Sequence, residues 1–236
     1  MRSRRAARPL LHVVAGVLID DAGRVLIAER PAGKHLAGRW EFPGGKLEPG
    51  EERTAGLARE LREELGITLG RTPLRPLMRV RHAYPTREVL LDTWVVRQYQ
   101  GEPRGLDGQA LRWCSLEDLM TVELLPADAP IVQALRLPER LTVRQSAAYI
   151  LAEEHDVRLS LSGPGAAPQL RGAYADSSSQ ALSAALNADF LAMRSALAPA
   201  ELTALCAAIG IPVYARGASL AQVWSWGASG INDLPA

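Results

Sequence analysis

Apolar residues in the first half of the chain form short runs that are separated by turn-forming residues. Residues 12–19 are almost continuously apolar, which is typical of a buried strand. Residues 21–23 predict a turn, and residues 24–30 predict the return strand of a hairpin. Later apolar runs predict three further strands, over residues 77–83, 89–98 and 111–114.

Helices are expected between these strands. Over residues 54–65, Leu57, Leu61 and Leu65 make an apolar stripe that can pack on a core. Ser115 is a good N-cap for a short helix over residues 115–120, and a last helix is expected over residues 129–135. This alternation predicts a mixed sheet with helices packed on it, which is an α/β sandwich.

The second half of the chain repeats a helix followed by a short apolar strand, which fits successive βα units of a parallel sheet. Pro199 and Gly210 are suited to begin and end one of the helices. The expected helices cover residues 146–154, 178–186, 199–209 and 219–226. The expected strands cover residues 157–161, 189–192, 211–215 and 228–231.

Composition narrows the class of protein. The chain has 236 residues, 47% hydrophobic content and a net charge of +1, as expected of a globular protein that forms no stable complex with nucleic acid. Cys114 and Cys206 lack metal-site spacing, and their small number favours a reducing cytoplasm without a disulfide. The arginine-rich residues 1–8 are interpreted as a frayed tail, not a signal peptide, and no run is long enough to span a membrane.

The helix over residues 54–65 crowds three carboxylates, those of Glu60, Glu63 and Glu64, into an arc of about 100°. Like charges at these spacings repel one another, and a hard divalent cation would offset the repulsion. The alternative is a solvated acidic face paired with Arg59 and Arg62. The turn-rich segment over residues 45–51 decides in favour of the cation.

That segment and helix resemble the Nudix box, the signature G-x5-E-x7-R-E-U-x-E-E-x-G-U of the Nudix hydrolase family, in which U is aliphatic. The resemblance implies an α/β/α sandwich over residues 9–137 and hydrolysis of phosphoanhydride bonds with Mg²⁺, or with Mn²⁺ as an alternative. Every fixed position is matched, by Gly45, Glu51, Arg59, Glu60, Leu61, Glu63, Glu64, Gly66 and Ile67.

The same resemblance implies roles for individual residues. The metal ligands would be the Gly44 carbonyl and the carboxylates of Glu60, Glu63 and Glu64, with Asp107 either a further ligand or only a turn residue. Glu51, Glu60 and Glu63 would take part in catalysis, held in position by Arg59. The choice of general base among the glutamates stays open.

Residues 38–46 are similar to the MutT branch of the family, whose members hydrolyse nucleoside triphosphates. The residues implied at the nucleotide are Arg30, Phe42, Lys46, Tyr84 and Asp128. Asp128 stands where the bacterial pattern has Asn, and an ionised carboxylate only accepts hydrogen bonds, so the base is left open. His35 is interpreted as a surface residue without an obvious partner.

The expected function is therefore release of pyrophosphate from oxidised purine nucleotides such as 8-oxo-dGTP, in nucleotide-pool sanitation and DNA repair. One alternative keeps this chemistry for CTP-type nucleotides or a thiamine-pathway diphosphate. Another is a non-catalytic, nucleotide-sensing module. The expected partner is a nucleoside triphosphate, and the chain is expected to be a monomer or a homodimer without membrane contact.

Residues 141–236 resemble the late strands of a thiamine phosphate synthase barrel, on the segments 187–190, 210–217 and 227–231. An eight-stranded barrel needs about 200 residues or more, so this region is expected to be a shortened, partial TIM-barrel-like domain. Its favoured role is that of a stabilising appendage, and the alternatives are a cover for the Nudix domain or a dimerisation surface.

Overall fold

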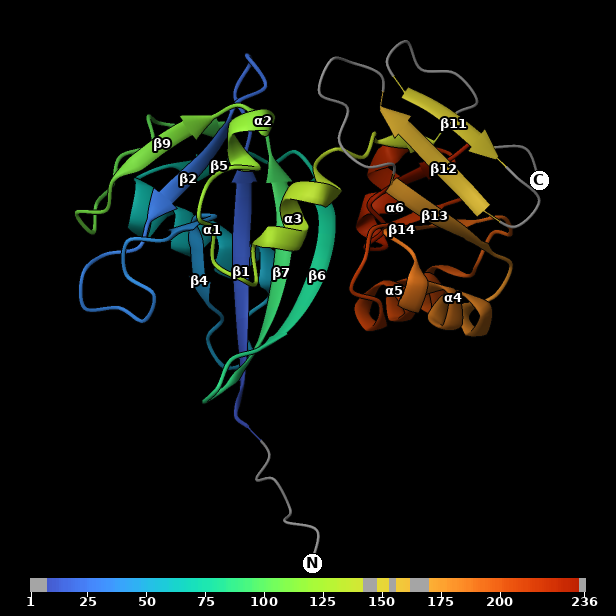
Figure 1. The fold of residues 1–236 in the computed structure, drawn as a ribbon, viewed down its shortest axis with the longest axis horizontal. Coiled ribbons are helices and arrows are strands. Elements are labelled where there is room, and N and C mark those ends of the chain that lie inside the picture. The colour runs from blue at the N-terminus through green and yellow to red at the C-terminus, as the bar shows by residue number, and fades with distance from the viewer. Residues whose placement is uncertain (1–7, 142–147, 153–155, 162–169, 234–236) are drawn as a thin grey trace, which may run out of the picture. The chain divides into compact units, whose positions relative to one another are not determined.

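A computed structural model describes residues 8–141, 148–152, 156–161 and 170–233 of the chain (Figure 1). Two compact units are present. The first comprises residues 1–70 and 80–130, and the second comprises residues 71–79 and 131–236. The helices and strands of each unit are described separately below.

The first unit is a mixed α/β structure built around strand β1 (Leu10–Leu18). This strand is central in a four-stranded sheet of order β4-β1-β7-β6. It pairs in parallel with β7 along its whole length, from Leu10 opposite Glu88 to Leu18 opposite Val96, and antiparallel with β4. The bounds of the other strands of this sheet are Gly44–Lys46 for β4, Arg75–Ala83 for β6 and Glu88–Val96 for β7. Residues 75–79 of β6 are counted with the second unit.

A three-stranded sheet of order β3-β2-β9 lies beside the first, and a pair of short strands, β5 and β8, forms a third sheet. The strand predicted over residues 111–114 is confirmed as β9. The bounds are Val25–Glu29 for β2, Trp40–Glu41 for β3, Thr68–Leu69 for β5, Tyr99–Gln100 for β8 and Leu111–Cys114 for β9.

The predicted hairpin of residues 12–30 is wrong beyond its turn. A single antiparallel bridge joins Ile19 to Val25, and from there β1 and β2 enter different sheets. The reason is that β1 pairs with β4 on one edge and with β7 on the other, so neither edge is left for β2.

Helix α1 (Arg53–Leu65) begins and ends on specific hydrogen bonds. The Glu52 carboxylate caps its first turn by accepting from the backbone N–H groups of Thr54 and Ala55, at 2.8 and 3.0 Å. Gly66 ends the helix at φ 70°, a left-handed conformation that favours glycine. The predicted stripe of Leu57, Leu61 and Leu65 is fully buried.

Packing fixes α1 against the central strand. A Cβ atom at Gly16 of β1 would lie 3.1 Å from the Leu61 side chain, so the strand and the helix approach closely there. The predicted short helix is confirmed as α2 (Leu116–Leu119), which starts with a capping box between Ser115 and Asp118. The last predicted helix is confirmed as α3 (Ala129–Ala134).

The second unit contains a seven-stranded sheet of order β10-β16-β15-β14-β13-β12-β11. Within this sheet, β10, β16, β15, β14 and β13 are parallel to one another, as the βα pattern predicted. Strands β12 and β11 follow β13 and add an antiparallel edge. The bounds are Arg140–Leu141 for β10, Ala148–Ala152 for β11, Asp156–Leu161 for β12, Leu170–Ala175 for β13, Phe190–Met193 for β14, Val213–Ala215 for β15 and Gly230–Asn232 for β16.

The helix predicted over residues 146–154 is wrong where the chain is described. Its middle is β11, which pairs antiparallel with β12 from Ala148 opposite Leu161 to Ala152 opposite Val157. The remainder, residues 146–147 and 153–154, lies outside the described residues. A short apolar run does not distinguish a strand from a buried helix by periodicity alone, and pairing with β12 decides the outcome.

The other predicted helices of this unit are confirmed, with shorter bounds. Pro199 stands at the first position of α5, and Ser219 caps α6. The helical segments are α4 (Ser178–Ala184), the 3₁₀ turn η1 (Ala185–Asn187), α5 (Pro199–Ala208) and α6 (Leu220–Ser225).

Apolar residues fill both faces of this sheet. On β14, Leu191 and Met193 join the cluster that also holds helix residues such as Leu202 of α5. The alternate residue Phe190 lies in a second cluster with Tyr214, their rings 5.8 Å apart and edge to face. The unit is therefore a partial βα fold in an open sheet.

Two further expectations concern the cysteines and membrane-spanning segments. Cys114 and Cys206 are both free cysteines. Among the described residues, no helix is both long enough and apolar enough to cross a bilayer.

Candidate functional site

Arg59, on the inner face of α1, gathers three glutamates of the first unit. Its guanidinium binds Glu51 in a bidentate manner, with Nε 2.9 Å and Nη2 2.8 Å from the two carboxylate oxygens. Its Nη1 donates to Glu60 at 2.9 Å and to Glu63 at 3.2 Å. Its Nη2 also donates to the Lys46 carbonyl at 3.0 Å, which ties the helix to the end of β4.

Two glycines let the carboxylates of α1 approach the backbone of β4. A Cβ atom at Gly45 would lie 2.2 Å from Oε2 of Glu60. The Gly44 backbone N–H donates to Oε2 of Glu64 at 3.3 Å, and a Cβ atom at Gly44 would lie 2.1 Å from the Val14 carbonyl oxygen. A side chain at Gly44 would clash with the backbone of β1, and one at Gly45 would displace the Glu60 carboxylate, so the two glycines let the carboxylates of Glu60 and Glu64 converge on this backbone.

The electrostatics of these glutamates differ. Burial, together with the charges of Glu60 and Glu41, raises the pKa of Glu64 to about 7. Hydrogen bonds from Arg59 and from the Glu48 backbone N–H lower the pKa of Glu51 to about 2. The cluster therefore contains one carboxyl that resists ionisation beside another that is held ionised.

The donor set is suited to a hard divalent cation, because every donor is an oxygen. Glu60 and Glu64 meet at the Gly44–Gly45 backbone, where a cation would relieve the like-charge crowding that raises the Glu64 pKa. Within the described parts of the chain, no three acidic, histidine or cysteine side chains surround a common point. The Arg59 guanidinium holds Glu51, Glu60 and Glu63 instead.

A cavity with about 590 Å³ of empty space, partly open to solvent, adjoins this cluster. Gly44 lines it, so the same residue borders the cavity and contacts the Glu64 carboxylate. Four of the five residues predicted at the nucleotide line the cavity, namely Arg30, Phe42, Tyr84 and Asp128. The aromatic lining, which includes Phe42 and Tyr84, is suited to a flat ring.

Lys46 and Asp107 lie elsewhere. Lys46 is exposed on β4 and does not line the cavity. Asp107 lies in an exposed turn whose backbone N–H donates to Gln109 at 2.9 Å, and Gln109 in turn donates to the Glu64 carbonyl at 3.1 Å. This loop is therefore attached to the backbone at the end of α1, while the Asp107 carboxylate makes no hydrogen bond or ion pair with the residues that the structure describes.

Asp128 is 3% exposed, yet its side chain has no hydrogen-bond or ion-pair partner among the described residues. Burial and the nearby charge of Glu41 raise its pKa well above the ordinary value, against the opposing effect of Arg30. A buried carboxyl without a protein partner that lines a cavity is available to a ligand.

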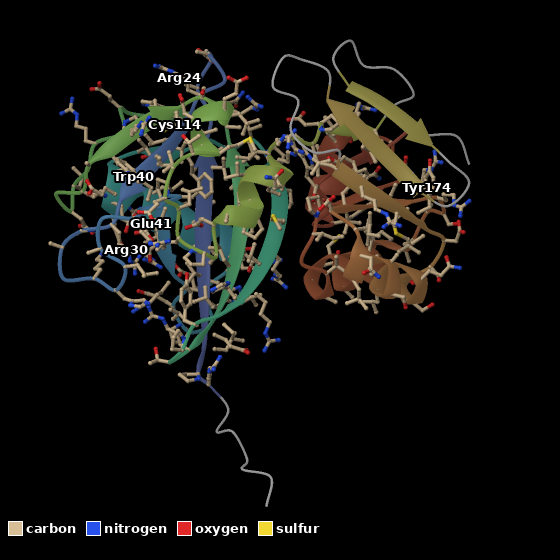
Figure 2. All side chains as sticks on the ribbon, in the orientation of Figure 1. Arg24, Arg30, Trp40, Glu41, Cys114 and Tyr174 are labelled. Carbon is tan, nitrogen blue, oxygen red and sulfur yellow. The ribbon has the colours of Figure 1, made fainter. Side chains whose placement is uncertain are left out.

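Two residues of this cavity escaped the sequence analysis. Glu41 of β3 lines the wall and forms an ion pair with Arg30 (Figure 2). The feature that could have pointed to Glu41 is its position directly before Phe42, in a strand of two residues. His35 is exposed, as expected of a surface residue. It nevertheless has contacts that the sequence did not indicate: it lines the cavity, its ring lies 6.0 Å from that of Tyr84, and its carbonyl accepts from Nε of Arg30 at 2.6 Å.

Comparison with known proteins agrees with this geometry. Residues 14–134 match the family described as NUDIX domain. The 8-oxo-dGTP diphosphatase of Escherichia coli (strain K12) is 35% identical over 126 residues, which cover 53% of this chain and 96% of that protein. The CTP pyrophosphohydrolase of the same strain is 41% identical over 127 residues, which cover 53% of this chain and 90% of that protein.

Solved structures are similar over the same half of the chain. The solution structure of the E. coli ORF135 protein is 38% identical, covers 55% of this chain and 90% of that chain, and superposes with a TM-score of 0.49. The matched family is one of hydrolases that act on phosphoanhydride bonds and generally use a divalent metal.

Proposed function

The chain belongs to the Nudix hydrolase family, and from that premise we propose that its domain over residues 9–137 is a Mg²⁺-dependent nucleoside triphosphate pyrophosphohydrolase. The proposed substrate is an oxidised purine nucleotide such as 8-oxo-dGTP, as the name of the 35% identical relative suggests. The observation that carries this proposal is the position of Gly44, which borders the ring-sized cavity and donates to the Glu64 carboxylate.

A bound cation would supply a deprotonated water as nucleophile and would neutralise charge on the phosphate oxygens. Glu60, Glu63, Glu64 and the Gly44 carbonyl would hold it, with Asp107 as a further ligand. Oxygen donors favour Mg²⁺, with Mn²⁺ as the alternative. In the balanced reaction one water is consumed, a phosphoanhydride P–O bond breaks, and the products are a nucleoside monophosphate and pyrophosphate.

The chain's own residues would position the reacting groups. Arg59 orders Glu51, Glu60 and Glu63 through the contacts measured above. Phe42 and Tyr84 would hold the base between them, and Arg30 would contact the nucleotide. Lys46, exposed on β4 next to Gly45, would meet phosphate as a point charge.

A second candidate keeps the chemistry and changes the base. The 41% identity to a CTP pyrophosphohydrolase favours a CTP-type nucleotide, and Asp128 in place of the expected Asn leaves that open. The thiamine-pathway diphosphate rests only on the resemblance of the second half. A sensing module without turnover is disfavoured, because all the glutamates of the box are present.

For residues 141–236 we propose a shortened thiamine phosphate synthase-like domain that acts as a stabilising appendage. The sequential order of the parallel strands β13, β14, β15 and β16 supports this proposal. The full chain is proposed to work as a monomer or a homodimer, in the cytoplasm, within nucleotide-pool sanitation.

The test is pyrophosphate release by the full chain with Mg²⁺, on 8-oxo-dGTP, dGTP, CTP and dCTP at equal enzyme concentration. The expected result is the highest kcat/KM for 8-oxo-dGTP and no turnover in EDTA. A preference for CTP or dCTP would replace the first candidate with the second, and absence of turnover on all four would overturn the enzymatic proposal.

A further inference from the structure

Asp128 is exceptional among the buried polar and charged residues of the described chain. Asp92 is paired with His12 and Arg53. In the second unit, Arg75 donates to the Ser229 carbonyl at 2.9 Å, and Asn232 donates to the Met193 carbonyl at 2.9 Å. Asp128 has no such partner within the residues described, although burying a polar group without a hydrogen bond is costly. A carboxyl retained under these conditions points to a ligand.

The nearest charges to Asp128 are those of Arg30 and Glu41, and these two residues are paired with one another. The pair is mostly shielded from solvent, with side-chain exposures of 19% and 23%. Arg30 is also fixed from behind, since its Nε donates to the His35 carbonyl. The cavity wall thus carries two cations, Arg30, whose charge is matched by Glu41, and Arg87. Asp128 forms an ion pair with neither of them among the described contacts.

Resting on the pyrophosphohydrolase proposed above, we propose that Asp128 recognises the base as a neutral carboxylic acid, and that Glu41 is the positioning residue that keeps it neutral by occupying Arg30. A neutral acid carries one O–H donor and one carbonyl acceptor, the same pair of functions as the side-chain amide of Asn. It therefore suits a base edge on which a hydrogen-bond acceptor stands next to an N–H group.

Electrostatics support this geometry. Burial and Glu41 both raise the Asp128 pKa, whereas Arg30 lowers it. If the charge of Glu41 is removed, Arg30 keeps its full charge beside Asp128 and favours the ionised carboxylate. An ionised Asp128 would lose its donor and would face the acceptor atom of the base with a negative charge, so binding of the nucleotide would weaken.

Other titratable groups face the same cavity, and their effects on the pH dependence of KM must be distinguished from the effect of Asp128. His35, Tyr84 and Arg87 line the cavity. Burial raises the pKa of Glu41, against the opposing charges of Arg30 and Lys34, and the charge of Glu41 contributes to the raised pKa of Glu64. His35 places an imidazole in the same cavity, so the experiment needs a variant without it.

The test is KM as a function of pH, from pH 5.5 to 9, for the triphosphate turned over best by the full-length protein. Four proteins are compared: the unmodified chain, Glu41→Gln, Asp128→Asn and the double variant. For the unmodified chain, KM should rise at high pH as Asp128 ionises. In Glu41→Gln this rise should move to lower pH by about one unit or more, with a larger effect on KM than on kcat.

The decisive comparison is made in the Asp128→Asn background. An amide does not ionise, so Asp128→Asn should flatten the rise of KM, and adding Glu41→Gln should no longer move the profile. A shift of the same size in both backgrounds would overturn the proposal, as would an unchanged profile in Asp128→Asn. Titration of the substrate itself is common to all four proteins and cancels in the comparison.

Three further variants serve as controls. Glu41→Asp keeps the charge and should stay close to the unmodified profile, which also serves if Glu41→Gln does not fold. His35→Gln should leave the high-pH rise in place. Glu123→Gln removes a carboxylate from another Arg–Glu pair, with Arg39 at 3.4 Å and 79% exposed, and should leave the profile unchanged. Turnover with an unshifted profile contradicts this inference alone, whereas absence of turnover on every nucleotide contradicts the pyrophosphohydrolase itself.

Discussion

Both units consist of sheets with helices packed on them, but different kinds of side chain approach their glycines closely. In the first unit, the space beside Gly45 is taken by the carboxylate of Glu60. In the second unit, the space beside Gly172 is filled by the Phe190 ring, and that beside Gly230 by the Glu139 carbonyl oxygen and the Tyr214 ring. One glycine serves to place charge, and the others serve to pack aromatic rings against a sheet.

Buried polar groups show the same contrast. In the second unit, the buried Ser229 hydroxyl donates to the Leu77 carbonyl at 2.7 Å and the Asn232 amide to the Met193 carbonyl at 2.9 Å, whereas the buried Nε of Arg194 and Nε1 of Trp224, in partly exposed residues, have no partner among the described residues. The first unit keeps the whole Asp128 carboxyl without a partner among the described residues and keeps Glu64 at a raised pKa of about 7. The difference lies in the carboxyls, since perturbed acidic groups that border a cavity mark the region expected to bind and react.

The largest expected effect is on activity, from Glu64→Gln. The amide keeps the shape but removes the charge that would hold the cation, so kcat/KM for pyrophosphate release should fall by about a hundredfold or more. The matched control is Glu102→Gln, which removes a carboxylate that is 78% exposed and paired only with exposed Arg104. Equal activity of the two variants would remove the proposed metal site from α1.

The next effect is on stability, from Phe190→Ala in the second unit. The Phe190 ring is fully buried against Gly172 and Tyr214, so its loss should lower the free energy of unfolding by about 3 kcal/mol or more. Urea denaturation followed by circular dichroism measures this change. Leu186→Ala is the control, because Leu186 is 83% exposed and its truncation should cost less than about 0.5 kcal/mol.

The same variant tests how separate the two regions are in function. Phe190 belongs to the core of the second unit, whereas the cavity and its glutamates belong to the first. At a temperature at which the variant is folded, KM and kcat for pyrophosphate release should stay within about twofold of the unmodified chain. A large loss of activity would show that the second unit contributes to the reaction.

Local signals in the sequence predicted much of the fold. The leucine stripe of α1, the Ser115 cap of α2 and Pro199 at the start of α5 are each determined within one turn of helix, and all three are found in the structure. The errors lie where distant pairing decides. The β1–β2 hairpin fails because β4 and β7 already occupy both edges of β1, and residues 148–152 form a strand because β12 pairs with them.

The candidate site divides in the same way. The box over residues 45–67 is contiguous, so its glutamates and Arg59 could be identified from their resemblance to the Nudix signature. Glu41 and His35 could not, because their importance comes from Arg30, Tyr84 and the cavity, which the fold assembles from separate segments. The protonation of Asp128 was equally inaccessible, since it depends on burial and on the pairing of its neighbours.

A third and smaller effect is expected from Gly45→Ala. The added methyl group would lie 2.2 Å from Oε2 of Glu60, so the carboxylate must move away from the Gly44–Gly45 backbone. Overpacking of this kind costs about 1–3 kcal/mol, and kcat/KM should fall about tenfold or more. Gly70→Ala is the control, because the nearest atom to its Cβ would be the Gln98 carbonyl oxygen at 3.8 Å. Equal activity of both variants would mean that Glu60 does not need its position beside Gly45.

The smallest effect concerns the dependence of stability on pH. Arg59 and the Glu48 N–H hold the Glu51 pKa at about 2 in the folded chain, below the ordinary value of 4.5. The folded state therefore favours ionised Glu51, and this stabilisation is complete above about pH 4.5 and is lost as the pH falls towards 2. Glu51→Gln should lower the free energy of unfolding at pH 6, and the difference from the unmodified chain should shrink between pH 5 and 3.

Urea denaturation at each pH without metal measures that difference, with Glu102→Gln as the control for loss of an exposed ion pair, which should change stability by less than about 0.5 kcal/mol. A difference that stays constant down to pH 3 would contradict the Arg59–Glu51 pair as described. Arg59 would then be able to turn fully towards Glu60 and Glu63. The cluster of glutamates, which distinguishes the first unit from the second, would need a different residue to hold its carboxylates together.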